Sequence, residues 1–325
     1  MFECFNVFMP ACPVGRFSCF NVNMIIGHRK NLDFLETALA TGRLSHAYCF
    51  VGPDQVGKRT VARHIAAKLL NTEPEKLGAH PDYFYIEREV DEKKNRLKKD
   101  ISVAQAKLVR NFLQNKSWLA GGKAVLIDEA EAINEEAANA LLKTLEEAAE
   151  NSLIILLTVN DKLLPETVRS RCQIIQFDFL PTDEIAAGLR TLGHGEELSR
   201  KAASLAWGRP GRAIGLVSEA GAIGDIELEI SRVKSLVNAP FYKKLEATES
   251  LFGDKDDAIR GRDRLREILD IWIMLWRDAM RGESVFGNGS PHEAAEMINE
   301  LQTARGLLGQ NIHPRLLMER ILLKI

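Results

Sequence analysis

The sequence has few cysteines, and their spacing is unlike that of a disulfide framework or a zinc knuckle. Of the five cysteines in 325 residues, three (Cys4, Cys12 and Cys19) lie within the first 20 residues, and no two form a C-x-x-C pair. A small disulfide-stabilised secreted fold is therefore excluded. We expect the protein to work in a reducing cytoplasm.

Long apolar runs and an excess of charge of either sign are also missing. No apolar run approaches the roughly 18 residues that a membrane-spanning helix needs, so no membrane is expected among the partners. The formal net charge is −2 at pH 7. Any contact with nucleic acid must therefore come from a local basic patch rather than from the whole surface.

The first 23 residues differ from the rest of the chain. They contain five phenylalanines among prolines, without helical or strand periodicity, and Glu3 precedes any basic residue, which is unlike a signal peptide. We expect residues 1–23 to be a disordered or wrongly assigned extension rather than a functional arm. Their deletion should leave the fold intact.

A glycine-rich loop is the most informative feature of the sequence. Residues 52–60 read Gly-Pro-Asp-Gln-Val-Gly-Lys-Arg-Thr. An apolar run at residues 48–51 predicts a strand before the loop, and the spacing over residues 61–70 predicts an amphipathic helix after it. Strand, glycine loop and helix is the order that places backbone amides around a phosphate.

The loop matches a P-loop except at one position. Gly52, Gly57 and Lys58 stand where a G-x-x-x-x-G-K-[ST] loop needs them to hold phosphates. Arg59, however, stands where the Mg²⁺-binding hydroxyl belongs. Thr60 cannot replace that hydroxyl, because the next residue of a helix points about 100° away. The loop can therefore hold the phosphates of ATP or ADP, but it lacks one ligand for Mg²⁺.

Two acids follow another predicted strand. Asp128 and Glu129 end the run that begins at Lys123. Asp128 lies 70 residues after Lys58. In a P-loop fold, such an aspartate holds Mg²⁺ and such a glutamate polarises the attacking water. An acid pair after a strand is usually a solvated turn, so it is the context of this pair that supports a nucleotide site.

Strand and helix patterns alternate before Pro181, and only helical patterns follow it. The alternation predicts an α/β fold with a parallel sheet and helices on both faces. We expect a P-loop nucleotide-binding-like domain at residues 24–180, a helical lid at 181–221 and an all-α bundle for oligomerisation at 222–325. In the last helix, the apolar stripe of Leu316, Leu317, Ile321 and Leu322 predicts a face for this oligomerisation.

Ser102 with Gln105 predicts a capping box at the start of one helix, and Asn134 is the predicted cap of another. Predicted strands are at residues 48–51, 83–86, 123–129, 153–158 and 172–177, and predicted helices include 32–40, 135–148, 182–191, 196–207, 210–219 and 262–281.

Several motifs in order resemble the clamp-loader AAA+ ATPases. The resemblance runs from about Met24 to Gly211. It implies an AAA+ domain, a lid and a C-terminal collar, in a complex that opens a sliding clamp and places it on primed DNA. The implied partners are other clamp-loader subunits (gamma/tau and delta), the clamp and primer–template DNA. The motifs are the loop at 52–58, Ile-Asp-Glu-Ala at 127–130, residues 139–147, Ser-Arg-Cys at 170–172 and residues 311–319.

The resemblance also implies roles for single residues. Arg171 is expected to be an arginine finger that reaches the γ-phosphate held by a neighbouring motor subunit. A fixed guanidinium at a transferred phosphoryl group can contribute roughly 10³ to 10⁵ in rate. The implied nucleotide-binding residues are Gly52, Gly57, Lys58, Arg59, Thr60, Asp128, Glu129, Thr158, Asn160 and Arg212.

Two departures from the family pattern argue against efficient ATP hydrolysis by this chain. Motor subunits end the loop in Lys-Thr or Lys-Ser, where this chain has Lys58 and Arg59. They also carry a sensor arginine in a Gly-x-x-Arg pattern, but here Gly211 follows Gly208 at that spacing and Arg212 comes one position late. We therefore expect a stator subunit whose own ATPase activity is weak or absent.

Two other classes of function remain alternatives. A self-sufficient ATPase, either a gamma/tau-type motor or another AAA+ ATPase, would need the missing hydroxyl and sensor arginine. A small-molecule P-loop kinase would leave the C-terminal helices unexplained. No zinc is expected, because many relatives carry four cysteines before a His-Pro-Asp turn, whereas residues 71–79 before His80 contain none.

Overall fold

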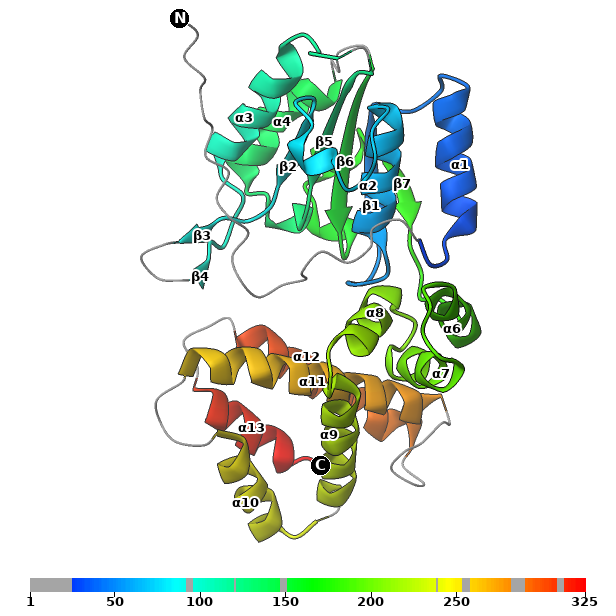
Figure 1. Ribbon diagram of the computed structural model, residues 1–325. Helices are drawn as coiled ribbons and strands as arrows, with labels where there is room; N and C mark the ends of the chain where they lie inside the picture. Colours follow the sequence, from blue (N-terminus) through cyan, green and yellow to red (C-terminus); the bar gives the residue numbers. More distant parts are fainter. Residues whose placement is uncertain are drawn as a thin grey trace, which may run out of the picture. The chain divides into compact units, whose positions relative to one another are not determined.

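We describe the protein from a computed structural model (Figure 1). Its helices and strands divide into two compact units, one ending at Ser218 and the other beginning at Glu219. The domain boundaries at residues 180 and 221 stay predictions, and the expected extension at 1–23 lies outside the described residues. The described residues are 25–91, 96–119, 121–146, 151–237, 239–252, 258–281, 290–308 and 313–325.

The first unit is built on a parallel sheet with the strand order β2-β5-β6-β1-β7. Every residue of β1, β5 and β6 is buried, as expected for central strands that are covered on both faces. The predicted α/β fold is confirmed. The strands are β1 (Ala47–Val51), β2 (Tyr83–Ile86), β5 (Lys123–Ile127), β6 (Ser152–Thr158) and β7 (Gln173–Gln176), and a separate antiparallel pair is formed by β3 (Val90–Asp91) and β4 (Arg96–Leu97).

Helices cover both faces of this sheet, as Figure 1 shows. Alternate strand residues point to opposite faces, so Cys49 and Phe50 belong to different cores. On the face of Cys49 lie α3 (Val103–Gln114), α4 (Glu135–Glu146) and α5 (Glu166–Arg169), and on the face of Phe50 lie α1 (Arg29–Ala40), α2 (Lys58–Leu69) and the short η1 (Leu77–Ala79).

Two predicted helix starts are confirmed by their caps. The Ser102 hydroxyl accepts a hydrogen bond from the Gln105 amide, and the Gln105 side chain accepts one from the Ser102 amide, which is a complete capping box. The side-chain oxygen of Asn134 accepts a hydrogen bond from the Ala137 amide at 2.8 Å and caps α4. The Gln105 side chain also donates to the backbone oxygen of Glu87 at 2.9 Å, which ties α3 to the end of β2.

Three short helices complete the first unit. They are α6 (Thr182–Thr191), α7 (Glu196–Leu205) and α8 (Pro210–Ser218), at or within two residues of the predicted bounds. α7 packs against both α6 and α8. No strand occurs after Pro181 in the described part of the chain.

The second unit is helical throughout its described residues. α11 packs against α12 and α9, and α10 packs against α13. Trp272 of α11 is fully buried, and its indole nitrogen donates to the buried carboxylate of Glu229 at 2.9 Å. The helices are α9 (Ala222–Leu236), α10 (Phe241–Phe252), α11 (Ala258–Met280), α12 (Pro291–Leu307) and α13 (Pro314–Leu322).

The last helix corrects one sequence-based argument. The apolar stripe of residues 316, 317, 321 and 322 was expected to remain open for oligomerisation. Instead, Leu317, Met318, Ile321 and Leu322 are buried in this chain, whereas Leu316 is 61% exposed. The reason is helical spacing, because the residue four positions after Leu316 is the charged Arg320. An oligomerisation role for residues 222–325 therefore stays a prediction without this support.

No described helix combines the length and the apolar character that a membrane crossing requires.

Candidate functional site

The predicted P-loop lies at the carboxyl end of β1, between the strand and α2. Ligands of open parallel sheets bind at this edge. Gly57, which directly precedes α2, has a φ of 109° that favours glycine. Lys58 opens the helix and is only 8% exposed. Its ammonium group donates to the backbone oxygens of Gly52 and Pro53, the latter at 2.9 Å.

Lys58 is held inside its own loop. Burial lowers the pKa of its ammonium group, although the nearby carboxylates of Asp54 and Asp128 act in the opposite direction. A buried ammonium that is bonded to loop carbonyls is preorganised to exchange one of these acceptors for a phosphate oxygen.

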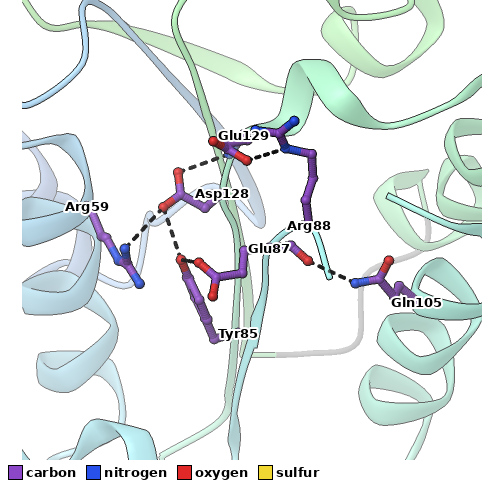
Figure 2. A network of polar contacts seen from close by, with 7 residues as sticks. All are labelled: Arg59, Tyr85, Glu87, Arg88, Gln105, Asp128 and Glu129. Carbon is purple, nitrogen blue, oxygen red and sulfur yellow. Dashed lines mark hydrogen bonds and ion pairs between the residues drawn. The ribbon is translucent and has the colours of Figure 1, made fainter. Parts of the chain in front are cut away.

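Arg59, the residue in place of the Mg²⁺-binding hydroxyl, contacts the predicted Mg²⁺ ligand itself. A terminal nitrogen of Arg59 lies 3.6 Å from a carboxylate oxygen of Asp128. The guanidinium also lies over the ring of Tyr85, 4.6 Å from its centroid. The Tyr85 hydroxyl lies 3.1 Å from the same oxygen of Asp128 and 2.9 Å from a carboxylate oxygen of Glu87 (Figure 2).

Tyr85 stays a neutral donor in this cluster. Burial and the charge of Asp128 strongly raise the pKa of its hydroxyl, although Arg59 acts in the opposite direction. The single hydroxyl proton is donated to one of the two carboxylates at a time.

Glu129, the predicted polarising residue, is also paired with an arginine. Its carboxylate lies 2.5 Å from the side-chain nitrogen Nε of Arg88. The strand register explains this pairing, because β2 and β5 are parallel with Ile86 opposite Ile127. The residues that follow the two strands, Arg88 and Glu129, therefore meet at the same edge of the sheet.

The residues at this edge do not fit Mg²⁺. In the P-loop pattern the ion needs a hydroxyl from the loop and a free carboxylate that follows another strand of the sheet. Here Arg59 removes the hydroxyl, and its cationic side chain pairs with the carboxylate of Asp128. The described residues also contain no group of three or more His, Cys, Asp and Glu side chains that could hold a metal ion.

Thr158 and Asn160 lie between the P-loop and the acids, because β6 separates β1 from β5. The Thr158 carbonyl accepts from the Gly52 amide at 3.2 Å, so the end of β6 supports the loop. The Thr158 hydroxyl donates to the backbone oxygen of Asn160 at 3.1 Å, and the Asn160 side chain caps the short η3 (Asp161–Leu163). Thr60 is half-buried in the first turn of α2.

The two lid residues are placed differently. The Gly211 amide donates to the backbone oxygen of Gln55 in the P-loop at 2.9 Å. The Arg212 guanidinium lies over the ring of Trp207, 4.7 Å from its centroid. The position where the Gly-x-x-Arg pattern has its sensor arginine is therefore occupied by Gly211, which contacts the P-loop through its backbone amide.

Arg171 lies at the amino-terminal end of the strands, whereas the P-loop lies at their carboxyl-terminal end. It precedes β7, whose first residue, Gln173, pairs with Tyr48 near the beginning of β1. Its guanidinium donates two hydrogen bonds to the carboxylate of Glu146 and one to the backbone oxygen of Thr167 at 2.7 Å. The side chain is 31% exposed. The structure therefore brings nine of the predicted residues to the P-loop end of the strands, places Arg212 over Trp207, and leaves Arg171 apart.

The signals for Tyr85 and Arg88 were present in the sequence but were missed. Tyr85 belongs to the strand predicted at residues 83–86, and Arg88 follows that strand at the same offset as Glu129 follows β5. Their position at the site depends on β2 lying beside β5.

The chain is similar in sequence to subunits of DNA polymerase III. Residues 27–181 match a family model described as "DNA polymerase III, delta subunit". The chain is 39% identical over 142 residues to the DNA polymerase III subunit delta' of Pseudomonas aeruginosa, covering 39% of this chain and 42% of the relative. It is 30% identical over 225 residues to the DNA polymerase III subunit tau of Escherichia coli, covering 66% of this chain and 35% of the relative.

The chain thus spans less than half of the length of these relatives. Among solved structures, a DNA polymerase III gamma subunit-related protein of Thermotoga maritima overlaps with a TM-score of 0.47 at 18% identity. That overlap covers 89% of this chain and 97% of the other.

Proposed function

We propose that this chain is a non-motor subunit of a clamp loader, because residues 27–181 match the family model described as "DNA polymerase III, delta subunit" and the chain is similar to a DNA polymerase III subunit delta'. In this function it forms part of a complex with gamma/tau-type and delta-type subunits that places a sliding clamp on primed DNA. Its own P-loop does not drive the complex. It donates Arg171 to the nucleotide site of a neighbouring ATPase subunit.

The place of Arg171 in the sheet is the observation that carries this proposal. Tyr48, the partner of Gln173, is four residues before Gly52, which corresponds to roughly 13 Å along a strand. Arg171 therefore lies at the amino-terminal ends of the strands, and the chain's own P-loop lies at their carboxyl-terminal ends. This distance from the chain's own P-loop supports a role for Arg171 at a phosphate of another subunit.

The P-loop site of the chain itself also supports the proposal, because its residues are unsuited to ATP hydrolysis. Arg59 pairs with Asp128, and Arg88 pairs with Glu129, so both acids of the P-loop pattern are neutralised within the chain. Hydrolysis would need Asp128 to hold the metal ion and Glu129 to polarise water. A gamma/tau-type motor is accordingly the less favoured alternative, although the tau subunit is among the similar proteins.

The test of the proposal is an arginine substitution in a reconstituted clamp loader. Arg171→Ala should reduce clamp-stimulated ATP hydrolysis by the assembly by roughly 10³-fold or more at the affected site. Arg171→Lys should rescue poorly, because a point charge does not reproduce the planar guanidinium. Assembly itself, followed by size-exclusion chromatography, should persist.

Arg169 provides a matched control. It lies two residues away, its side chain is 34% exposed, and it pairs with Asp161 at 3.7 Å. Arg169→Ala removes the same charge from the same turn and should leave the rate of the assembly within about twofold, as expected for a surface substitution away from the reacting atoms. An Arg171→Ala assembly that hydrolyses ATP and loads clamps as fast as the Arg169→Ala assembly would refute the proposed role.

A further inference from the structure

The inference concerns the P-loop of this chain and does not depend on Arg171. We propose that the guanidinium of Arg59 takes the place of the divalent cation, so that the loop binds the phosphates of a nucleoside di- or triphosphate without Mg²⁺. In this arrangement the nucleotide is a bound structural ligand rather than a substrate.

The position of Arg59 supports the substitution of one cation for another. The residue follows Lys58 directly and stands where the metal-binding hydroxyl belongs, so its side chain leaves the helix on the side of the missing ion. Its terminal nitrogen lies 3.6 Å from Asp128, the carboxylate that would otherwise face the ion. A divalent cation at that position would meet a fixed positive charge and lose its anionic ligand.

The guanidinium can contact a phosphate without leaving Asp128. It carries five N–H donors in a planar arrangement, and the side chain is 52% exposed. The contact with Asp128 uses one edge of the group, so donors remain for a phosphate oxygen. Arginine is suited to this task because its planar donors match the spacing of phosphate oxygens.

The side chains of this site are held in place by their neighbours. Tyr85 lies under the guanidinium and is half-buried against the hydrophobic core on the α2 face of the sheet. Its hydroxyl contacts Asp128, so ring and hydroxyl together fix both members of the ion pair. Lys58, buried and bonded to two loop carbonyls, supplies the second positive charge beside the loop amides.

The experiment measures nucleotide affinity of the full chain alone. A fluorescent ADP and a fluorescent ATP analogue are titrated in excess Mg²⁺ and again in EDTA. For the wild-type protein, Kd should differ by less than about twofold between the two conditions, because no metal ligand is involved. Lys58→Ala should weaken binding in both conditions by at least about tenfold, since it removes a charged hydrogen bond to phosphate.

Arg59→Thr restores the hydroxyl and removes the internal cation. Its affinity in EDTA should fall by roughly tenfold or more, and Mg²⁺ should recover most of that loss. Lys68→Thr is the control, because Lys68 lies near the other end of α2 and pairs with Glu36 at 2.7 Å. It removes the same charge from the same helix and should bind nucleotide as the wild type does in both conditions.

Three results would overturn the proposal. They are wild-type binding that requires Mg²⁺, no wild-type binding in either condition, and an Arg59→Thr variant that binds equally well in EDTA and Mg²⁺. If melting shows that Arg59→Thr is unfolded, Arg59→Lys serves instead. It should bind more weakly in EDTA than the wild type, and unchanged affinity would overturn the role of the planar group. The titration uses this chain alone, so its failure is distinguishable from failure of the Arg171 test.

Discussion

The backbone amide of Gly211 donates a hydrogen bond to the backbone oxygen of Gln55, at 2.9 Å. This contact brings the first turn of α8 directly onto the P-loop. A β-carbon on Gly211 would itself lie 2.9 Å from that oxygen, closer than side-chain carbons approach backbone atoms. The lid therefore rests on the loop only because residue 211 has no side chain.

Gly211→Ala is expected to destabilise the first unit. Overpacking against backbone costs about 1–3 kcal/mol of unfolding free energy, more than alanine gains over glycine in a helix. The measurement is chemical denaturation of the full chain. Gly195→Ala is the control, because nothing lies within 4 Å of the β-carbon that it adds. Equal stability of the two variants would show that the lid does not depend on this contact.

The same contact predicts that restoring the sensor arginine will not restore hydrolysis. Gly211→Arg, alone or with Arg59→Thr, should give an isolated chain without measurable ATP turnover, because the new side chain displaces the lid and Glu129 stays paired with Arg88. A steady-state phosphate-release assay checks this. Turnover that depends on Mg²⁺ and disappears with Lys58→Ala would contradict it.

Glu146→Gln should make Arg171 more available to a neighbouring subunit. Arg171 and Glu146 are partly exposed, at 31% and 48%, and such ion pairs are worth about 0.2–1 kcal/mol. Its loss should lower the concentration of this chain that half-saturates ATP hydrolysis by the assembly, by up to about fivefold.

The double variant with Arg171→Ala isolates this effect. Without the guanidinium, Glu146→Gln should change nothing. A lower stimulated rate for Glu146→Gln alone would instead mean that the carboxylate holds Arg171 in its working position.

Asp82 is expected to stabilise the fold in a pH-dependent way. The carboxylate is fully buried and accepts hydrogen bonds from the amides of Trp118 and Leu119, at 2.9 and 2.8 Å. Burial acts to raise its pKa, but these amides outweigh it and hold the pKa below the ordinary value of 3.8. Asp82→Asn should therefore lower the unfolding free energy by about 1–3 kcal/mol at neutral pH.

The sign of the pH effect follows from the lowered pKa. The folded state favours the charged carboxylate, so its contribution is complete above the ordinary pKa and is lost as the pH falls through the lower folded value. The stability difference between wild type and Asp82→Asn should be constant from neutral pH to about pH 4 and should shrink below that. Asp33→Asn, a change at an exposed acid, is the control. A difference that grows in acid would refute the assignment.

Local patterns predicted the elements of the fold well, because they depend on near neighbours in the sequence. Ser102 and Gln105 form the expected capping box, and β2 has the predicted bounds. The loop at Gly52–Lys58 was recognisable for the same reason, since its strand, glycines and helix are contiguous.

Contacts between distant segments could not be read in the same way. The pairing of Arg59 with Asp128, and of Arg88 with Glu129, depends on the strand order and on the register of Ile86 opposite Ile127. Neither the strand order nor the register can be predicted from the local spacing of apolar residues. The stripe of the last helix failed for a related reason, because apolar spacing alone does not tell which face the rest of the bundle buries.

The separation of Arg171 from the P-loop gives the protomer a head and a tail. Subunits joined head to tail form heterologous interfaces, and such a row has a direction and two unlike ends unless it closes. In the proposed function, this chain completes a neighbour's site with Arg171. At its own P-loop, both acids already have arginines of their own. A subunit that donates an arginine and receives none is suited to the end of such a row. In that position it defines which ATPase subunit is the first of the row.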